Sequence, residues 1–474
     1  MKTITLTAAL ALATALTFSC TSNVEMPPHP DDFVGTGGSS SSGTDNTLLG
    51  GPVSYYGKLK ASGNKLVGSK TGATVQMRGV SLFWSNTGWG GDKFFTANAV
   101  NAMVDDWKAE IIRVPIGYSE DGGYSTDASN LARVKTAIDA AIAKDVYVII
   151  DWHSHNAHNE LAAATTFFEE MAKTYGANNH VIFEIYNEPN CSDGSNNLGC
   201  TKTTWTQIKT YANSIISTIR QHSDNLILVG TPSWNQDVDV AASSQVSDSK
   251  SNIAYVFHFY AYTHPLTYFQ SSINAVLNAG YPVFVSEYGT THADGGGGNN
   301  YNTHDATSAN AWHAYMDSKY ISSCAWSVND KYEGSAFFGT SSTTRFNMSS
   351  WTSTSSMTAS GQYIYNKLNA YANSAAWRGN GGATSSSSST GGGRTTYCDF
   401  GPITQFGGGC FEMMDENDCD LEWGEVVDSC PSYSYCLDYS DYSCISMTKI
   451  SSCSNWAYGS YEISNSCPSG WTIY

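Results

Sequence analysis

Two glutamates stand where the chain shows its clearest signs of chemistry. Glu188 lies in Ile-Tyr-Asn-Glu-Pro (185–189), and Glu287 lies in Val-Phe-Val-Ser-Glu-Tyr-Gly (283–289). Each ends a short apolar run that predicts a buried strand, and a strand-breaking Pro189 or Gly289 follows. A carboxylate in that position faces a cleft, so the pair predicts acid–base or nucleophilic catalysis at a shared site. The alternative is that each is only a surface charge at a strand end.

Other apolar runs also end in residues that suit a site. An arginine inside a buried strand needs an anion, so Arg113 predicts a carboxylate partner at the same cleft. The further candidates are Asp-Trp-His (151–153), Asn187, His258 with Tyr260, and Trp326. Each alone has a structural explanation, such as a core histidine or a packing tryptophan, but together they predict one constellation.

The elements that must position these residues follow a repeating order. Eight apolar runs predict strands at 75–81, 111–116, 147–152, 181–186, 226–229, 254–258, 283–287 and 321–326. Helical spacing of apolar residues separates most of them, as at 131–142, 167–175 and 208–219. Eight strand-then-helix units within residues 53–378 predict an α/β fold of the (β/α)8 TIM barrel type, in which catalysis lies at the carboxyl ends of the strands.

Together these segments resemble glycoside hydrolase family 5, the cellulase family of barrel glycosidases. The matching segments are Arg78-Gly79-Val80, Arg113-Val114-Pro115, Asp151-Trp152-His153, Tyr186-Asn187-Glu188-Pro189, His258-Phe259-Tyr260, Ser286-Glu287-Tyr288-Gly289 and Trp326-Ser327-Val328-Asn329-Asp330-Lys331. They cover the central block and none of the tail. The resemblance implies a retaining endo-β-1,4-glucanase of the bacterial branch, which hydrolyses cellulose or soluble β-glucans by double displacement.

The resemblance also implies roles for the two glutamates and their neighbours. Glu188 resembles the general acid/base and Glu287 the nucleophile. Arg113 would pair with Glu287 and lower its pKa, and Tyr260 would donate a hydrogen bond to it. Glu188 would need a raised pKa to hold its proton near neutral pH.

The remaining implied roles concern the sugar. Asn187 would bind the 2-hydroxyl of the sugar at the cleaved bond. His153 and His258 would line the same subsite, and Trp326 would form its stacking floor. Lys331 and Glu333 match a polar pair that reads a neighbouring sugar in some members of the family.

One segment departs from the family pattern. Many close cellulase relatives carry Ser-x-His-Gly after the first strand, whereas this chain has Ser-Leu-Phe-Trp-Ser-Asn (81–86), so Phe83 or Trp84 is the expected platform. Substrate preference therefore stays open among cellulose, mannan, xyloglucan and mixed-linkage glucan. An inactive carbohydrate-binding barrel is the alternative from another class, and it predicts a missing catalytic group.

Composition limits the partners. The net charge is −18 with only 24 Lys and Arg, which argues against nucleic acid. The 13 Trp, 29 Tyr and 18 Phe suit stacking on sugar rings. The histidines of 153–158 could hold a metal, but cleft-wall and loop positions are the prediction, so no metal and no cofactor is expected. We also expect no oligomer.

The N-terminus predicts export. Lys2, an apolar stretch at 6–18 and Ser19-Cys20 form a signal peptide over residues 1–20, and Cys20 stands where a bacterial lipoprotein carries its lipid. Secretion and anchoring at the cell surface, including the outer membrane, remain alternatives. A flexible linker is predicted at 21–52 and a Gly/Ser-rich one at 379–396.

Most of the cysteines lie near the C-terminal end of the chain. Of 12 cysteines, eight lie in the acidic module 397–474, which has twelve acidic side chains and one basic one, Lys449. So small a module is expected to depend on disulfides, with zinc as the rival. It could bind carbohydrate through Trp423, Trp456 and Trp471, serve attachment, or act as a spacer. Cys191 and Cys200 predict a local disulfide, and Cys324 a free core thiol.

Overall fold

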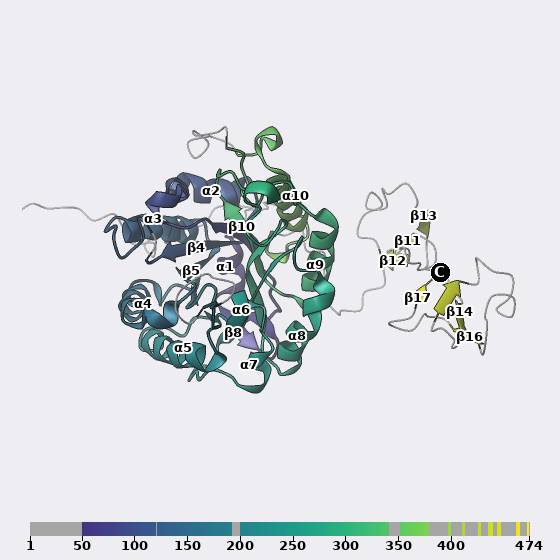
Figure 1. Ribbon diagram of the computed structural model, residues 1–474, viewed down its shortest axis with the longest axis horizontal. Helices are drawn as coiled ribbons and strands as arrows, with labels where there is room; N and C mark the ends of the chain where they lie inside the picture. The colour runs from purple at the N-terminus through teal and green to yellow at the C-terminus, as the bar shows by residue number, and fades with distance from the viewer. Residues whose placement is uncertain are drawn as a thin grey trace, which may run out of the picture. The chain divides into compact units, whose positions relative to one another are not determined.

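Eight parallel strands close into a barrel in the computed structural model (Figure 1). The structure describes residues 50–119, 121–191, 200–340 and 351–378, and seven short strands beyond residue 396. Around the barrel the strands follow the order β10-β3-β4-β5-β6-β7-β8-β9, so chain neighbours are also neighbours in space. This confirms the predicted (β/α)8 barrel.

The barrel strands lie close to the predicted runs. They are β3 (Arg78–Leu82), β4 (Ile111–Gly117), β5 (Tyr147–His153), β6 (Val181–Glu184), β7 (Ile227–Val229), β8 (Ile253–Tyr260), β9 (Val283–Gly289) and β10 (Ser323–Val328). The prediction that both glutamates end a strand is wrong. Because β6 stops at Glu184, Glu188 lies on the following loop, and because β9 continues to Gly289, Glu287 lies within its strand.

Side chains alternate between the inside of the barrel and the helix-covered outside. On β4, Ile112 and Val114 belong to the large core between strands and helices, whereas Ile111 belongs to a second cluster inside the barrel. A strand period of two requires this division. Both faces are apolar over much of their length, which is why the runs read as continuous hydrophobic segments.

Helices cover the outside of the barrel. They are α2 (Ala97–Asp105), α3 (Asn130–Ala143), α4 (Leu161–Tyr175), α5 (Trp205–Ile219), α7 (Val240–Ser243), α8 (Leu266–Asn278), α9 (Ala306–Lys319) and α10 (Ala359–Ala372). The short α6 (Pro232–Asn235) lies instead on the loop after β7, where Asn235 donates to the backbone oxygen of Asn187. Several begin at a side-chain cap: Thr96, Asp305 and Thr358 each accept a backbone N–H of the first turn. Thr204 forms a capping box with Gln207 at the start of α5. The predicted helical segments at 131–142, 167–175 and 208–219 are α3, α4 and α5.

A small lid of secondary structure closes the amino ends of the strands. Helix α1 (Pro52–Tyr56) leads into the antiparallel hairpin of β1 (Leu59–Ser62) and β2 (Lys65–Gly68). Val53, Tyr56 and Leu59 join the cluster inside the barrel. With this end filled by apolar side chains, the carboxyl ends of the strands are left for chemistry.

The predicted disulfide and free thiol are both present. Cys191 and Cys200 are bonded, with Cα atoms 5.7 Å apart. Cys324 is unpaired and buried inside the barrel, where burial raises the pKa of its thiol. Short 3-10 helices lie in the described loops, at Thr87–Trp89, Asp92–Phe94, Ala157–Asn159, Gly298–Asn300, Thr354–Ser356 and Ala376–Arg378.

The chain divides into two compact units, Met1–Gly382 and Ala383–Tyr474. The second contains a three-stranded sheet of β12 (Cys410–Glu412), β11 (Tyr397–Asp399) and β13 (Glu425–Val427). Its four-stranded sheet has the order β16 (Tyr461–Ser464), β14 (Tyr435–Asp438), β15 (Ser443–Ser446) and β17 (Thr472–Ile473). The predicted signal peptide, the Gly/Ser linker and the cysteine side chains of this unit lie outside the described residues. Among those that are described, no helix has the length and apolar character needed to cross a membrane.

Candidate active site

One buried arginine holds the polar interior of the barrel together. Arg113, on β4, donates from Nε to Glu184 at 2.8 Å, from Nη1 to Glu287 at 2.8 Å and from Nη2 to the amide oxygen of Asn187 at 2.6 Å. Asp151 lies 2.9 Å from Nη2. The predicted carboxylate partner of Arg113 therefore exists, and three carboxyl groups rather than one surround its fully buried guanidinium. Burial raises the pKa of Asp151 to about 7 although Arg113 opposes the shift.

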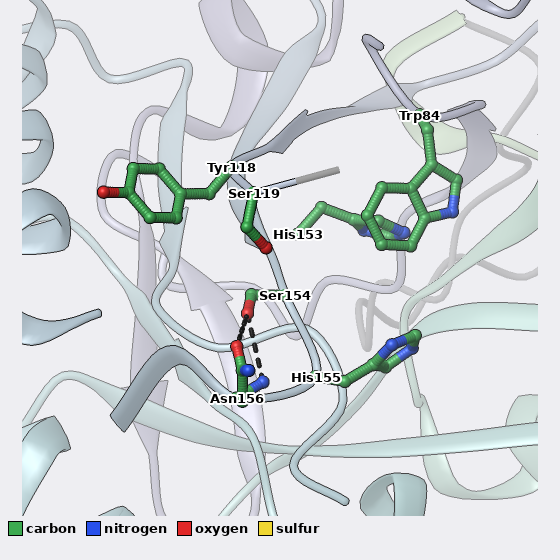
Figure 2. A pocket seen from close by; sticks show the side chains of 7 residues that line it. All are labelled: Trp84, Tyr118, Ser119, His153, Ser154, His155 and Asn156. Atoms are coloured by element: carbon green, nitrogen blue, oxygen red, sulfur yellow. Dashed lines mark hydrogen bonds between the residues drawn. The ribbon is translucent and has the colours of Figure 1, made fainter. Parts of the chain in front are cut away.

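A wall of rings stands beside this cluster. His153 lies with Nδ1 2.6 Å from the Asp151 carboxylate and stacks on Trp326, with centroids 5.2 Å apart and planes at 4°. Figure 2 shows Trp84 next to His153 and His155 in a small pocket, with centroid distances of 4.2 and 5.8 Å. The aromatic residues of segment 81–86 lie in the same group of rings, since Phe83 packs against Trp326 and Trp84 against His153. Burial lowers the pKa of His153 well below its ordinary value, so the ring is neutral.

The predicted polar pair lies at the edge of this wall. Lys331 Nζ is 3.7 Å from the Glu333 carboxylate and 4.2 Å from the centre of the Phe83 ring, which itself packs against Trp326. Asn329 donates to Glu333 at 3.4 Å. The pair is therefore continuous with the rings around Trp326.

Glu287 points from β9 into the cluster and is only 4% exposed. Arg113 donates to one of its oxygens and Tyr260 to the other, each at 2.8 Å. Burial and the charge of Glu188 nevertheless raise the pKa of Glu287 to about 8, against the opposing effects of Arg113 and Tyr260. One guanidinium shared by three carboxylates cannot neutralise all of them.

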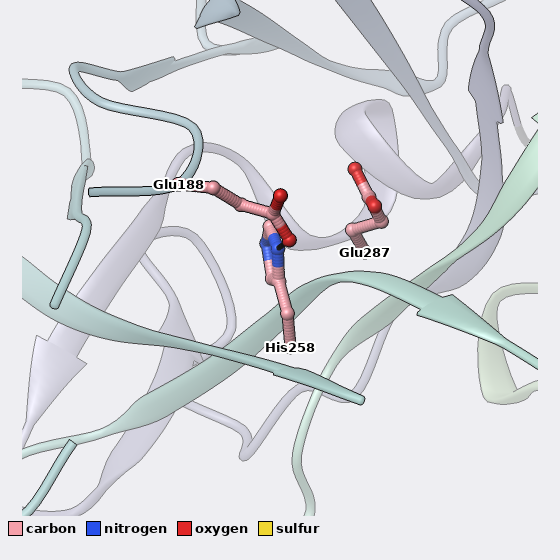
Figure 3. Close-up of side chains that lie close together, drawn as sticks. All are labelled: Glu188, His258 and Glu287. Atoms are coloured by element: carbon pink, nitrogen blue, oxygen red, sulfur yellow. Dashed lines mark hydrogen bonds and ion pairs between the residues drawn. The ribbon is translucent and has the colours of Figure 1, made fainter. Parts of the chain in front are cut away.

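Glu188 faces Glu287 from the loop after β6. Its carboxylate contacts Nδ1 of His258 at 2.9 Å and Nε2 of His155 at 3.2 Å. Figure 3 shows the His258 ring under Glu188 with Glu287 opposite, and oxygen or nitrogen atoms of the three lie within 4.8 Å of one another. Burial alone would raise the pKa of Glu188, but the two imidazoles reverse this and lower it.

The sequence predicted a raised pKa for Glu188 and a lowered pKa for Glu287. In the protein without substrate both directions are wrong. Glu287 has the raised pKa and Glu188 the lowered one, so the two carboxyls titrate as one unit and share a single proton at neutral pH. The sequence identified Arg113 as a partner of Glu287 but not the two imidazoles that contact Glu188.

The structure brings every predicted site residue to the same end of the barrel. Two further residues belong to no quoted motif: Glu184, and Trp234, whose ring centre lies 3.9 Å from Nζ of Lys202. Glu184 carries a recognisable signal, because it is a charged residue inside the otherwise apolar run 181–186. Asp151 and Ser286 were each part of a quoted motif but had no assigned role.

The three histidines of 153–158 do not converge on one point. His153 contacts Asp151, His155 contacts Glu188, and His158 Nδ1 lies 2.8 Å from the Tyr186 hydroxyl. Glu188, His258 and Glu287 have donor atoms suited to a cation, yet Arg113 already occupies the charged side of Glu287. A metal there would compete with that guanidinium.

Comparison with known proteins gives a consistent result. The model of the family "Cellulase (glycosyl hydrolase family 5)" matches residues 68–332. Endoglucanase Z of Dickeya dadantii is 45% identical over 282 residues, which span 59% of this chain and 62% of that protein. Endoglucanase A of Butyrivibrio fibrisolvens is 38% identical over 301 residues, 62% of this chain and 65% of that protein.

A solved structure agrees with these relatives. A variant of the catalytic domain of a Thermobifida fusca endoglucanase in complex with cellotetraose is 33% identical, with a TM-score of 0.58, and the match covers 68% of this chain and 100% of that one. The chain thus spans a little under two thirds of the length of the two curated relatives and the whole of this catalytic domain.

Proposed function

The chain belongs to the cellulases of glycosyl hydrolase family 5, and on that premise we propose that it is a retaining endo-β-1,4-glucanase. The observation that carries the proposal is the facing pair of carboxyl groups, whose oxygens approach within 4.8 Å at the carboxyl ends of the strands. Retaining glycosidases place their carboxyls about 5–5.5 Å apart, whereas inverting ones leave about 6.5–9.5 Å for a water molecule.

The proposed reaction has two steps. Glu287 attacks the anomeric carbon while Glu188 gives its proton to the departing glycosidic oxygen, so the C–O bond breaks as the glycosyl-enzyme bond forms. In the second step Glu188 takes a proton from water, which displaces Glu287 and releases the sugar with its configuration retained. Arg113 and Tyr260 hold Glu287 in position for both steps.

The shared proton must reach Glu188 as the first step proceeds. Positive charge develops on the anomeric carbon in the transition state and stabilises Glu287 as an anion. The glycosidic oxygen at the same time requires the proton on Glu188. Because the two carboxyls are close, ionising Glu287 makes protonation of Glu188 more favourable.

The neighbouring residues supply the sugar contacts in this proposal. The amide oxygen of Asn187 accepts from Arg113, and in this proposal its NH2 group binds the sugar 2-hydroxyl. Trp326 forms the stacking floor, while His153 and His258 line the reactive subsite. Lys331 and Glu333 would bind the next glucosyl unit.

Two measurements test the proposal. Proton NMR during hydrolysis of cello-oligosaccharides should show the β-anomer first, and initial formation of the α-anomer would exclude retention. Parallel rates on carboxymethylcellulose, mannan, xyloglucan and mixed-linkage β-glucan should favour the β-1,4-glucans. Much faster hydrolysis of mannan would replace the substrate assignment with a mannanase.

We further propose export through residues 1–20, with an acidic module at 397–474 that binds carbohydrate or serves attachment. The support is the sequence alone: an apolar stretch before Cys20 and eight cysteines after residue 397. Metabolic labelling with a fatty acid, compared with Cys20→Ala, distinguishes lipidation from secretion. Retention on insoluble cellulose, compared between the full chain and one ending at residue 378, tests the module.

A further inference from the structure

Two tyrosines form an exposed stack beside the polar pair Lys331 and Glu333. Tyr332 lies between those two residues on the loop after β10, and Tyr301 lies on the loop between β9 and α9. Their ring centroids are 4.4 Å apart and their planes differ by 8°. Tyr332 is 64% exposed, so the stack leaves the second face of its ring open to a ligand.

A tight turn places Tyr332 at its tip. The backbone N–H of Glu333 donates to the carbonyl oxygen of Lys331 at 2.9 Å, which closes a three-residue turn with Tyr332 at its centre. The turn also brings the two flanking side chains together, with Lys331 Nζ 3.7 Å from the Glu333 carboxylate. Because consecutive Cα atoms are about 3.8 Å apart, a glucan chain held by this pair leaves it close to the Tyr332 ring.

Backbone contacts between the two loops fix the position of the stack. The N–H of Gly334 donates to the oxygen of Gly296, and the N–H of Ser335 donates to the oxygen of Gly295, each at 2.9 Å. A Cβ on Gly334 would come within 2.4 Å of the carbonyl oxygen of Tyr301, so only glycine allows this close approach. The loops are therefore joined through their backbones, and the rings are stacked before any ligand binds.

A preformed aromatic face suits a particular kind of ligand. Tyr301 covers one face of Tyr332 and holds the ring in a fixed orientation, which reduces the entropy lost when a ligand binds to the other face. Aromatic faces stack on the flat apolar faces of pyranose rings, while the phenol hydroxyl stays in water. A β-1,4-glucan chain presents such faces one after another along its length.

We propose that Tyr332, supported by Tyr301, is a binding platform for the glucosyl unit beyond the one bound by Lys331 and Glu333, so that the enzyme favours longer β-1,4-glucan chains. The inference rests on the proposed function, in which this polar pair binds the sugar next to the reactive subsite. The ring stacks on a sugar that does not react. It therefore determines chain-length preference through binding energy and takes no part in the chemical steps.

Another exposed tyrosine provides the matched control. Tyr320 is 51% exposed and follows the last residue of α9, near the amino end of β10 and so at the opposite end of the barrel from the site. Nζ of Lys65 lies 5.1 Å from the centre of its ring. Loss of Tyr320 removes an exposed aromatic ring of the same size without touching the proposed platform.

The test compares Tyr332→Ala with Tyr332→Phe, which keeps the ring, and with Tyr320→Ala, all in the full chain. In Tyr332→Ala the value of kcat/KM on cellohexaose should fall about fivefold, because the stacking contact is lost. A dinitrophenyl cellobioside has only two glucosyl units, which fill the reactive subsite and the site at Lys331 and Glu333. Its kcat/KM should therefore change less than about twofold. Tyr332→Phe and Tyr320→Ala should resemble wild type on both substrates.

Binding without hydrolysis gives the second readout. Calorimetric titration of cellohexaose into Glu287→Gln, which lacks the proposed nucleophile, measures the dissociation constant directly. Adding Tyr332→Ala to this variant should raise the Kd about fivefold, whereas adding Tyr320→Ala should leave it unchanged. Soluble oligosaccharides are used so that adsorption of residues 397–474 to insoluble cellulose does not enter the comparison.

Three outcomes would overturn the inference. An equal loss on cellohexaose and the cellobioside would place the effect of Tyr332→Ala on Lys331 and Glu333, and no loss on either would remove the platform. A loss in Tyr332→Phe as large as in Tyr332→Ala would replace stacking by a hydrogen bond from the hydroxyl. Failure of the proposed function looks different, because wild type itself would then cleave neither substrate, while the titration would still measure the contribution of Tyr332 to binding.

Discussion

The barrel interior contains an apolar layer and a charged layer, which are separated by two residues along each strand. Ile111, Ile149 and Ile182 pack in the inner apolar cluster near the amino ends of β4, β5 and β6. Two residues further along the same strands and on the same face stand Arg113, Asp151 and Glu184, which form the charged cluster. The comparison teaches that stability and chemistry occupy adjacent layers about 6–7 Å apart. We call the charged cluster the upper layer and the apolar cluster the lower layer. Changes in the upper layer should affect catalysis, and changes in the lower layer should affect folding.

The largest effect is expected from the proposed nucleophile in the charged layer. Glu287→Gln removes the carboxylate that we propose attacks the anomeric carbon, so kcat on cello-oligosaccharides should fall by at least about 10⁴-fold. Circular dichroism and thermal unfolding should show an intact fold. Glu170→Gln, on the exposed side of α4 where Glu170 pairs with Lys135, is the matched control and should retain wild-type kcat. Full hydrolysis by Glu287→Gln would remove the charged layer from the mechanism.

Arg113→Lys should lower both the stability of the protein and its kcat. An ammonium group cannot meet Asp151, Glu184 and Glu287 together, so buried carboxylates lose their partner, and urea unfolding should show a loss of about 3–5 kcal/mol. Because Glu287 loses its fixed position, kcat should fall about a hundredfold.

Arg220→Lys provides the matched control for this change at the opposite end of the barrel. Arg220 makes a buried bidentate pair with Asp248, at 2.7 and 2.9 Å. Its substitution should lower stability and leave kcat of the folded enzyme within twofold of wild type. Similar losses of kcat in both variants would contradict the separation into layers.

Phe284→Ala tests the lower layer on β9. Phe284 is fully buried in the inner cluster, two residues before Ser286. Its truncation leaves a cavity and should lower the free energy of unfolding by about 3–5 kcal/mol. Below the unfolding transition, kcat and KM should stay close to wild type. A tenfold fall in kcat for the folded protein would show that the two layers are mechanically coupled.

The smallest effect, taken per pH unit, is the dependence of stability on pH. The pKa of Glu287 is about 8 in the folded protein, while an ordinary glutamate titrates near about 4.3. Between these values the folded state binds a proton that the unfolded state has lost, so this group's contribution to stability falls as pH rises. Glu287→Gln should remove that slope, which is at most about 1.4 kcal/mol per pH unit. Denaturant titrations at pH 5, 6, 7 and 8 measure it, and equal slopes in both proteins would contradict the raised pKa.

Much of the barrel could be predicted from the sequence because its signals are periodic. The apolar runs have the length of strands, and the helices carry apolar residues at 3.6-residue spacing. The charged cluster was visible in part, since Arg113 breaks an apolar run and Glu188 and Glu287 follow one. Glu184 has the same kind of signal but was passed over within its run.

The remaining features depend on distances that sequence does not contain. The pKa directions of Glu188 and Glu287 follow from where two imidazoles and three other charged groups meet, and a motif names these residues without their separations. The register shift in β9 is equally hidden. From Phe284 to Glu287, three steps along β9 match two steps along β8, and from Val285 to Tyr288 three steps match two along β10, which is a β-bulge that Val-Phe-Val-Ser-Glu does not reveal. Regular alternation would have sent Ser286 and Glu287 to opposite faces.

That register shift makes the site sensitive to chain length as well as to residue identity. Deleting one residue from β9 would give a regular strand with better backbone pairing, and it would also send either Ser286 or Glu287 into the helix layer. Deletion of one residue would thus remove either Ser286 or Glu287 from the site, although the identities of the remaining residues are unchanged. Transplanting this centre onto an idealised barrel therefore requires copying the backbone defect along with the side chains.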